Sequence, residues 1–166
     1  AASVVLDGGV IAFVGPSGAG KSTACRHVGQ APLFSVDRLA VLPAAVLPAA
    51  LLPADVAGAT WMAHPLPGGT RPVPSITSAE HRWLPLAGAL RVQRSTSETA
   101  IVRLAPARAV MSLRESTFQA GLAPHAEHEL LAALDELAQQ VPVARLELLL
   151  GASLAPLLRR WLEDVG

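Results

Sequence analysis

Apolar residues form short continuous runs in the first half of the chain, a pattern that is typical of buried β-strands. Residues 2–6 and 10–14 are two such runs, and Asp7-Gly8-Gly9 between them predicts the tight turn of a β-hairpin. Residues 22–28 then predict a short helix that ends near Gly29. The chain therefore predicts a hairpin, a glycine-rich segment and a helix, in that order.

Further along, strand patterns give way to segments with helical periodicity. Strands are predicted over residues 33–36, 84–93, 100–104 and 143–150, with 39–42 extended, and helices over 106–113, 124–140 and a C-terminal stretch capped by Ser153. Pro106 and Pro124 suit the first turn of their helices, and leucines recur on one face of 124–140. Residues 64–81, rich in proline, glycine, serine and threonine, predict a long loop. Early strands and late helices predict an α/β or α+β fold with a central mixed sheet and flanking helices.

Three apolar pentads follow one another in the middle of the chain. Residues 41–45, 46–50 and 51–55 each carry proline at the third position. Proline at every fifth residue is incompatible with a regular helix or a central strand, so residues 43–58 are expected to form a loop. Two interpretations stay open, a low-complexity repeat tolerated at the surface and an apolar lid or partner contact.

Composition narrows the class of protein. A length of 166 residues suits a single domain, 1–166, with a sizeable core, and 51% of the residues are hydrophobic. Thirteen basic residues balance thirteen acidic ones, so nucleic acid and anionic membranes are not expected as partners. Neither a membrane span nor a secretory signal is expected, because prolines break the longest apolar stretch and no basic leader opens the chain. The single cysteine, Cys25, is expected to pack in the core and agrees with a cytoplasmic location.

One lysine occurs in the chain, and it lies in the glycine-rich segment between the hairpin and the first helix. The segment Gly15-Pro16-Ser17-Gly18-Ala19-Gly20-Lys21-Ser22 fits G-x-x-x-x-G-K-[ST], the phosphate-binding P-loop. Its glycines let the backbone turn tightly and aim N–H groups at a triphosphate, and the helix N-terminus adds partial positive charge. We therefore expect ATP and Mg²⁺ as cofactors, with Lys21 on the β and γ phosphates and the Ser22 hydroxyl on the metal. The expected nucleotide-binding residues are Gly15, Pro16, Ser17, Gly18, Ala19, Gly20, Lys21, Ser22 and Thr23.

Phosphoryl transfer also requires a carboxylate near the γ-phosphate, either to hold Mg²⁺ or to accept the proton of the acceptor hydroxyl. Asp37 follows the apolar run 33–36, and the end of that strand should return beside the P-loop. Asp37 is therefore the expected catalytic and metal-binding carboxylate, together with Lys21 as the catalytic cation. A turn aspartate is the alternative interpretation.

Histidines and loop arginines give weaker signals. His64 could face the nucleotide and Arg71 could neutralise transferred charge, but loop side chains without such a role are the favoured interpretation. His125 and His128 fall on one helix face, yet no third ligand is suitably spaced, so surface histidines are expected there.

Residues 15–23, followed by Phe34-Ser35-Val36-Asp37-Arg38-Leu39, resemble the HPr kinase/phosphorylase family in its small HPr-kinase-like branch. Later stretches are similar too, over residues 85–90, 103–109 and 141–146. The resemblance implies a P-loop kinase domain whose fold is shared with ATP-type phosphoenolpyruvate carboxykinases. It also implies transfer of phosphate to a hydroxyl of a protein, peptide or small molecule, with a precursor peptide as a plausible acceptor.

The chain departs from that family in two places. Relatives carry two adjacent aspartates where this chain has Val36-Asp37, so either Asp37 serves alone or a residue outside the motif substitutes. Relatives also carry a histidine before the hairpin, and Ala1-Ala2-Ser3 resembles the residues that follow it, which predicts a missing N-terminal portion.

The expected function is an ATP-dependent kinase that transfers the γ-phosphate to a serine-type hydroxyl of a protein or peptide. A non-catalytic nucleotide-binding regulatory module and a small-molecule kinase are the alternatives. The apolar pentads are compatible with self-association, and kinases of the family are often oligomers, which leaves a homo-oligomer open.

Overall fold

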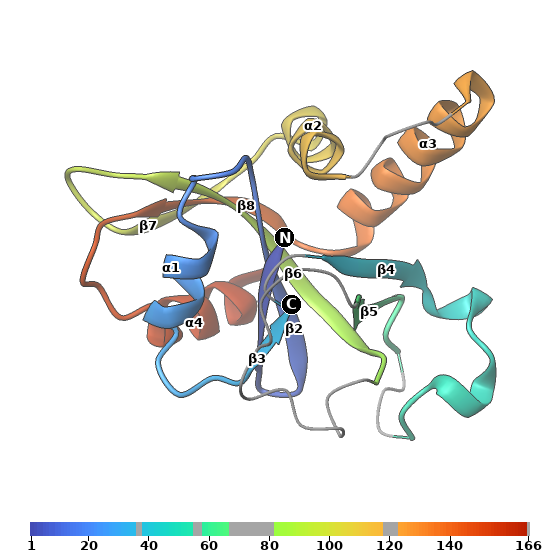
Figure 1. Cartoon of the computed structure of the whole chain (residues 1–166), viewed down its shortest axis with the longest axis horizontal. Helices are drawn as coiled ribbons and strands as arrows, with labels where there is room; N and C mark the ends of the chain where they lie inside the picture. The colour runs from blue at the N-terminus through green and yellow to red at the C-terminus, as the bar shows by residue number, and fades with distance from the viewer. Residues whose placement is uncertain (36–37, 55–57, 67–81, 118–122, 166) are drawn as a thin grey trace.

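Eight strands of the described residues form one mixed sheet, and helices cover both of its faces (Figure 1). The computed structural model describes residues 1–35, 38–54, 58–66, 82–117 and 123–165. The strands are β1 (Ala2–Leu6), β2 (Gly9–Val14), β3 (Leu33–Ser35), β4 (Leu39–Pro43), β5 (Trp61–Pro65), β6 (Leu84–Arg94), β7 (Ala100–Arg103) and β8 (Val143–Leu148). The helices are α1 (Lys21–His27), α2 (Pro106–Ser116), α3 (Pro124–Gln140) and α4 (Ala155–Val165), with short 3₁₀ turns η1 (Ala44–Val46) and η2 (Ala49–Leu51).

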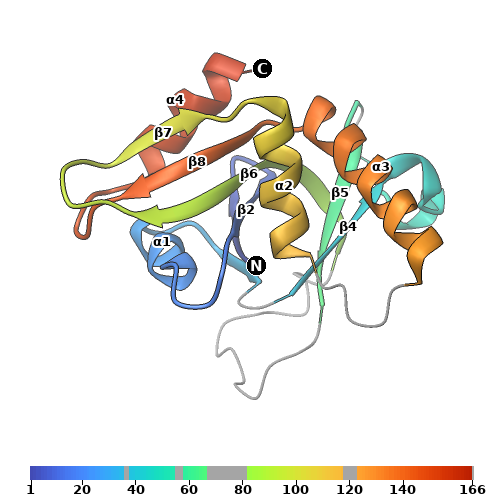
Figure 2. The same ribbon diagram turned by 90° about the horizontal axis from the view of Figure 1, so that it is seen from above.

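Strand β6 organises the sheet because it is long enough to pair with three neighbours. The order along the sheet is β3-β1-β2-β6-β5-β4. One edge of β6 pairs in parallel with β2, while the other edge pairs first with β5 and then, from Ala89 to Arg94, in parallel with β8. Strand β7 closes this side by pairing antiparallel with β8 (Figure 2). The centre of the sheet is thus parallel, and antiparallel strands flank it.

The hairpin forms as the sequence predicts. Strands β1 and β2 pair antiparallel, from Ala2 opposite Phe13 to Leu6 opposite Gly9. Asp7 and Gly8 connect them with φ of 50° and 87°. Positive φ at both central residues is the requirement of a type I′ turn, whose twist matches that of the two strands.

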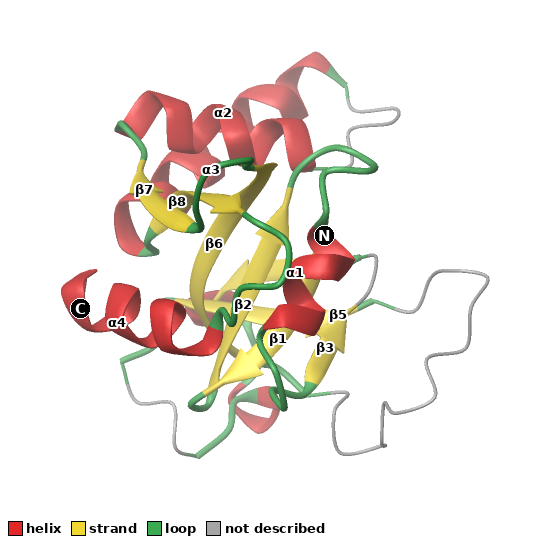
Figure 3. Ribbon diagram, turned by 90° about the vertical axis from the view of Figure 1, so that its left-hand side faces the viewer, coloured by secondary structure: helices red, strands yellow, loops and turns green. Residues whose placement is uncertain are grey.

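The two faces of the sheet bury separate apolar cores. Figure 3 shows the helices and strands between which these cores lie. Alternation along each strand sends successive side chains to opposite faces, so Phe13 packs with α1 and α4 while Val14 packs with α2 and α3. The first core includes Cys25, Leu90, Leu146 and Leu158. The coarse expectation of a mixed α/β fold with flanking helices is therefore confirmed.

Several element boundaries differ from the expectations. Residues 61–65 form strand β5, so the predicted loop from 64 onward is wrong at His64 and Pro65, while residues 67–81 lie outside the described part. Helix α2 continues past Leu113 to Ser116, and α4 begins at Ala155 rather than directly after Ser153. Helix α3 has the predicted limits.

The pentads take up a structure that their prolines permit. The first pentad enters β4 and ends it at Pro43, and β4 pairs only with β5 among the described strands, so its other edge tolerates a residue without an N–H. The next residues form the two 3₁₀ turns rather than irregular loop. The absence of a regular helix or central strand here is confirmed for the described residues.

Candidate functional site

The P-loop sequence connects the carboxyl end of β2 to the start of α1, so the predicted order of strand, loop and helix is confirmed. Three of its glycines have positive φ, at 134° for Gly15, 78° for Gly18 and 102° for Gly20. Side chains with a Cβ rarely adopt these angles, so glycine is required for this path of the backbone. The loop tip from Pro16 to Gly18 is exposed, which leaves its backbone accessible to a ligand.

Lys21 folds back over the loop that it ends. Its Nζ donates hydrogen bonds to the carbonyl oxygens of Gly15, at 2.8 Å, and Pro16, at 2.7 Å. The ammonium group therefore lies at the mouth of the loop, where phosphate oxygens would replace these carbonyls as acceptors. Helix α1 has only seven residues, so the loop amides and this ammonium supply most of the positive character.

The carboxyl half of β6 supports the loop from the side. A Cβ added at Gly15 would lie 3.5 Å from the Val92 carbonyl oxygen, which shows how closely the loop follows this strand. At the end of β6, the Arg94 guanidinium donates to the Gly18 carbonyl oxygen at 3.3 Å. Sequence reasoning did not single out Arg94, because it could not reveal that β6 runs parallel to β2.

A second arginine of β6 lies on the opposite face of the strand. Arg91 is the register partner of Val14, the last residue before the loop. Its guanidinium forms an ion pair with Glu115 of α2 at 2.6 Å and lies 3.4 Å from the Ser112 hydroxyl. These two charges next to the loop were also missed, because the pair joins segments that only the tertiary fold brings together.

Asp37, the expected carboxylate, lies with Val36 outside the described residues. Strand β3, which ends two residues before Asp37, is described. Ser35 pairs with Ser3, and Ser3 pairs with Ala12, both antiparallel. Strand β3 therefore runs in the same direction as β2, and the carboxyl ends of both strands lie on the same side of the sheet. The two strands are about 10 Å apart because β1 lies between them. This direction is the one that the expectation for Asp37 requires.

The other expected side chains lie away from the loop or outside the description. His64 belongs to β5 and its ring lies 5.1 Å from that of Trp83, so it is not a loop residue. Arg71 falls outside the described residues. His125 and His128 are exposed on α3, and among the described residues no group of three side chains is arranged to hold a metal.

Cys25 is a packing residue, as expected. It belongs to α1 and is buried in the core between this helix and the sheet, and this burial raises the pKa of its thiol to about 12. A thiol with such a pKa stays protonated at neutral pH, so Cys25 is not available as a nucleophile.

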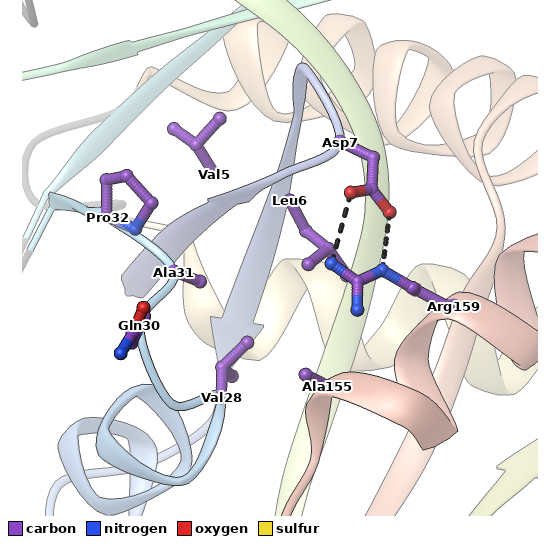
Figure 4. Close-up of a pocket in the computed structure, with 9 residues that line it drawn as sticks. All are labelled: Val5, Leu6, Asp7, Val28, Gln30, Ala31, Pro32, Ala155 and Arg159. Carbon is purple, nitrogen blue, oxygen red and sulfur yellow. Dashed lines mark hydrogen bonds and ion pairs between the residues drawn. The ribbon is translucent and has the colours of Figure 1, made fainter.

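A cavity of about 690 Å³ lies between the sheet and helices α2 and α3, and Val14 is part of its wall. A smaller cavity of about 370 Å³ lies at the opposite end of the hairpin, where Asp7 and Arg159 face each other in a paired hydrogen bond (Figure 4). Of these two cavities, the larger one adjoins the P-loop through Val14.

Comparisons of the chain with protein-family models, with curated proteins and with solved structures found no match. Among the described residues, no helix combines the length and the apolar character needed to cross a bilayer.

Proposed function

We propose that this protein is an ATP-dependent kinase that transfers the γ-phosphate to a serine-type hydroxyl of a protein or peptide. The observation that carries the proposal is the loop between β2 and α1, whose glycines adopt positive φ and whose lysine points over the loop mouth. A loop of this shape presents backbone N–H groups and an ammonium to phosphate oxygens.

The residues of the loop fit a magnesium nucleotide. A Cβ at Gly18 would meet nothing within 4 Å, so the space beside the loop tip is open, and the Ser22 side chain is exposed next to Lys21. Ser22 and Asp37 would hold Mg²⁺, which neutralises phosphate charge when bound. Lys21 would orient the β and γ phosphates by donating hydrogen bonds to their oxygens.

In the proposed reaction, the acceptor hydroxyl oxygen forms a bond to the γ-phosphorus, and the bond from that phosphorus to the bridging oxygen breaks. ADP leaves with the electron pair of the broken bond, and Asp37 accepts the hydroxyl proton. The acceptor class rests on the resemblance to the HPr kinase/phosphorylase family. The single cysteine, which cannot form an internal disulfide, supports the inference of a cytoplasmic protein. We also propose self-association, which the apolar pentads and the resemblance to that family support.

Calorimetric titration with Mg-ATP tests the nucleotide site. Wild-type protein should bind, Lys21→Met should lose most of the binding, and Arg160→Met should bind as wild type does, because Arg160 is an exposed cation on α4. Transfer is then tested with labelled ATP and serine peptides, where Asp37→Asn should retain binding but lose transfer. Absence of heat with Mg-ATP, or unchanged binding by Lys21→Met, would overturn the proposal.

A non-catalytic nucleotide-binding module is the second candidate, and Val36 favours it because it stands where the similar family carries an aspartate. Wild-type protein would then bind Mg-ATP without transfer, and Val36→Asp should introduce transfer activity. Transfer by the wild-type chain excludes this candidate.

A further inference from the structure

The cavity between the sheet and helices α2 and α3 begins where the P-loop begins. Its volume is about 690 Å³. Ala12 and Val14 of β2 and Ala89 of β6 contribute to its sheet side, and Gly15 directly follows Val14. A molecule in this cavity would therefore have one end within a residue or two of the loop that is proposed to hold the γ-phosphate.

Most of the wall is apolar. Trp61 and Leu86 line it from the sheet, and Leu130 and Leu134 line it from α3. Protein interiors are normally packed without voids of this size, and pockets of roughly 300–1,000 Å³ with mostly apolar walls are typical of ligand sites. The space is too large and too apolar to be filled by a few ordered waters.

The charged side chains that line the cavity limit the class of ligand that can bind in it. Arg38 is the single charged side chain among the described residues that line the cavity, and no carboxylate is among them. The Ser116 and Thr117 hydroxyls donate to carbonyl oxygens of their own helix, those of Ser112 and Leu113. A lysine or arginine side chain would lose its hydration here without gaining a counter-charge, whereas an uncharged apolar group would lose nothing.

We propose that this cavity binds large uncharged apolar side chains that flank the serine of an acceptor peptide. The assignment rests on the proposed kinase function, and it narrows the substrate class of that same site. An extended peptide advances about 3.3 Å per residue, so side chains within about three residues of the serine can enter the cavity while the hydroxyl reaches the loop. The cavity exceeds one side chain in size, which favours apolar residues on both sides of the serine.

Helix α3 offers a matched pair of substitutions for the test. Ala133 lines the cavity, whereas its neighbour Ala132 is exposed on the same helix. Ala133→Phe places a ring in the cavity, and Ala132→Phe places the same ring in solvent. Far-UV circular dichroism and the melting temperature of both variants report whether each one folds.

Binding is measured by fluorescence anisotropy with labelled serine peptides in which leucine, alanine or lysine flanks the serine. Wild type and Ala132→Phe should bind the leucine peptide about tenfold or more tightly than the alanine peptide, and the lysine peptide least. Ala133→Phe should lose this preference. Mg-ATP binding, measured by calorimetry, should be equal in all three proteins, because the loop is unchanged.

Equal binding of leucine and alanine peptides, or an unchanged preference in Ala133→Phe, would overturn the assignment. Competition by n-octanol without any preference among the peptides would assign the cavity to a small-molecule acceptor instead, and would also overturn it. Loss of Mg-ATP heat in wild type would instead reject the kinase function itself, and the separate titration distinguishes that failure from the failure of the peptide site.

Discussion

The guanidinium of Arg94 donates a hydrogen bond to the carbonyl oxygen of Gly18 across 76 positions of sequence, at 3.3 Å. The contact ties the last residue of β6 to the exposed tip of the P-loop. Gly15 also runs beside Val92 at the same end of β6. The loop is thus held from two sides, by its own lysine and by the neighbouring parallel strand.

Replacement of Arg94 by glutamine should weaken Mg-ATP binding about threefold. The exposed hydrogen bond that the Arg94 guanidinium donates to Gly18 contributes only modestly to the order of the loop. Calorimetry with Mg-ATP measures the change. Arg160→Gln removes an exposed cation on α4 and serves as the control. An equal loss of binding in both variants would mean that net charge, and not the contact with Gly18, is responsible.

Gly88→Ala should destabilise the fold by about 1–3 kcal/mol, the usual cost of overpacking. A Cβ at Gly88 would lie 2.6 Å from the Trp161 ring, so the new methyl group and the ring cannot both keep their places. Urea denaturation measures the free energy of unfolding. In a Trp161→Leu background the same alanine should cost less, and an undiminished cost would place the clash elsewhere.

Stability should fall as the pH rises from about 9 to about 12, because burial raises the pKa of Cys25 to about 12 from an ordinary value of 9.0. The folded state favours the protonated thiol, so its contribution is complete below the unfolded pKa and is lost as the pH approaches the folded one. The slope can reach about 1.4 kcal/mol per pH unit. Tyrosine is absent and Lys21 is the one lysine, so few other side chains titrate in this range.

Urea denaturation at successive pH values measures that slope, and Cys25→Ala provides the comparison. The variant should show a much flatter dependence between pH 9 and 11. An equal slope in both proteins would exclude the buried thiol as its origin.

The pKa of Asp7 should rise toward its ordinary value of 3.8 when Arg159 is replaced by glutamine. The hydrogen bond from Arg159 is the main cause of the lowered pKa of Asp7, desolvation opposes it, and the charge of the guanidinium adds a smaller lowering. The lowered pKa means that the pair stabilises the fold above about pH 3.8 and stops doing so as the pH falls through the folded value. Carboxyl NMR titration gives the pKa directly, and Arg160→Gln should leave it unchanged.

The sequence pattern predicted correctly those elements that depend on a few neighbouring residues. Pro124 at the first helical position and the periodic leucines after it defined α3, and Asp7-Gly8 defined the hairpin turn, because both depend on backbone preferences of a few residues. The P-loop was predicted for the same reason, since its glycines and its lysine are adjacent in sequence. Whether those residues bind a nucleotide stays a prediction.

Features that depend on contacts between distant segments were not predictable. Strand β5 was missed because its five residues contain a histidine and end in proline beside a polar stretch. Trp61 in this strand donates to Gln140 at the end of α3, a contact that no pattern within either segment indicates. The cavity is likewise a product of how β4, β5, α2 and α3 pack together.

The parallel pairing of β2 with β6 also bears on biosynthesis. The hairpin and the P-loop leave the ribosome before β6 does, and the strand that pairs with Val14 ends far later, at Arg94. Until that strand is available, one edge of β2 is exposed to other nascent chains. A chaperone that shields this edge during translation would therefore raise the yield of native protein.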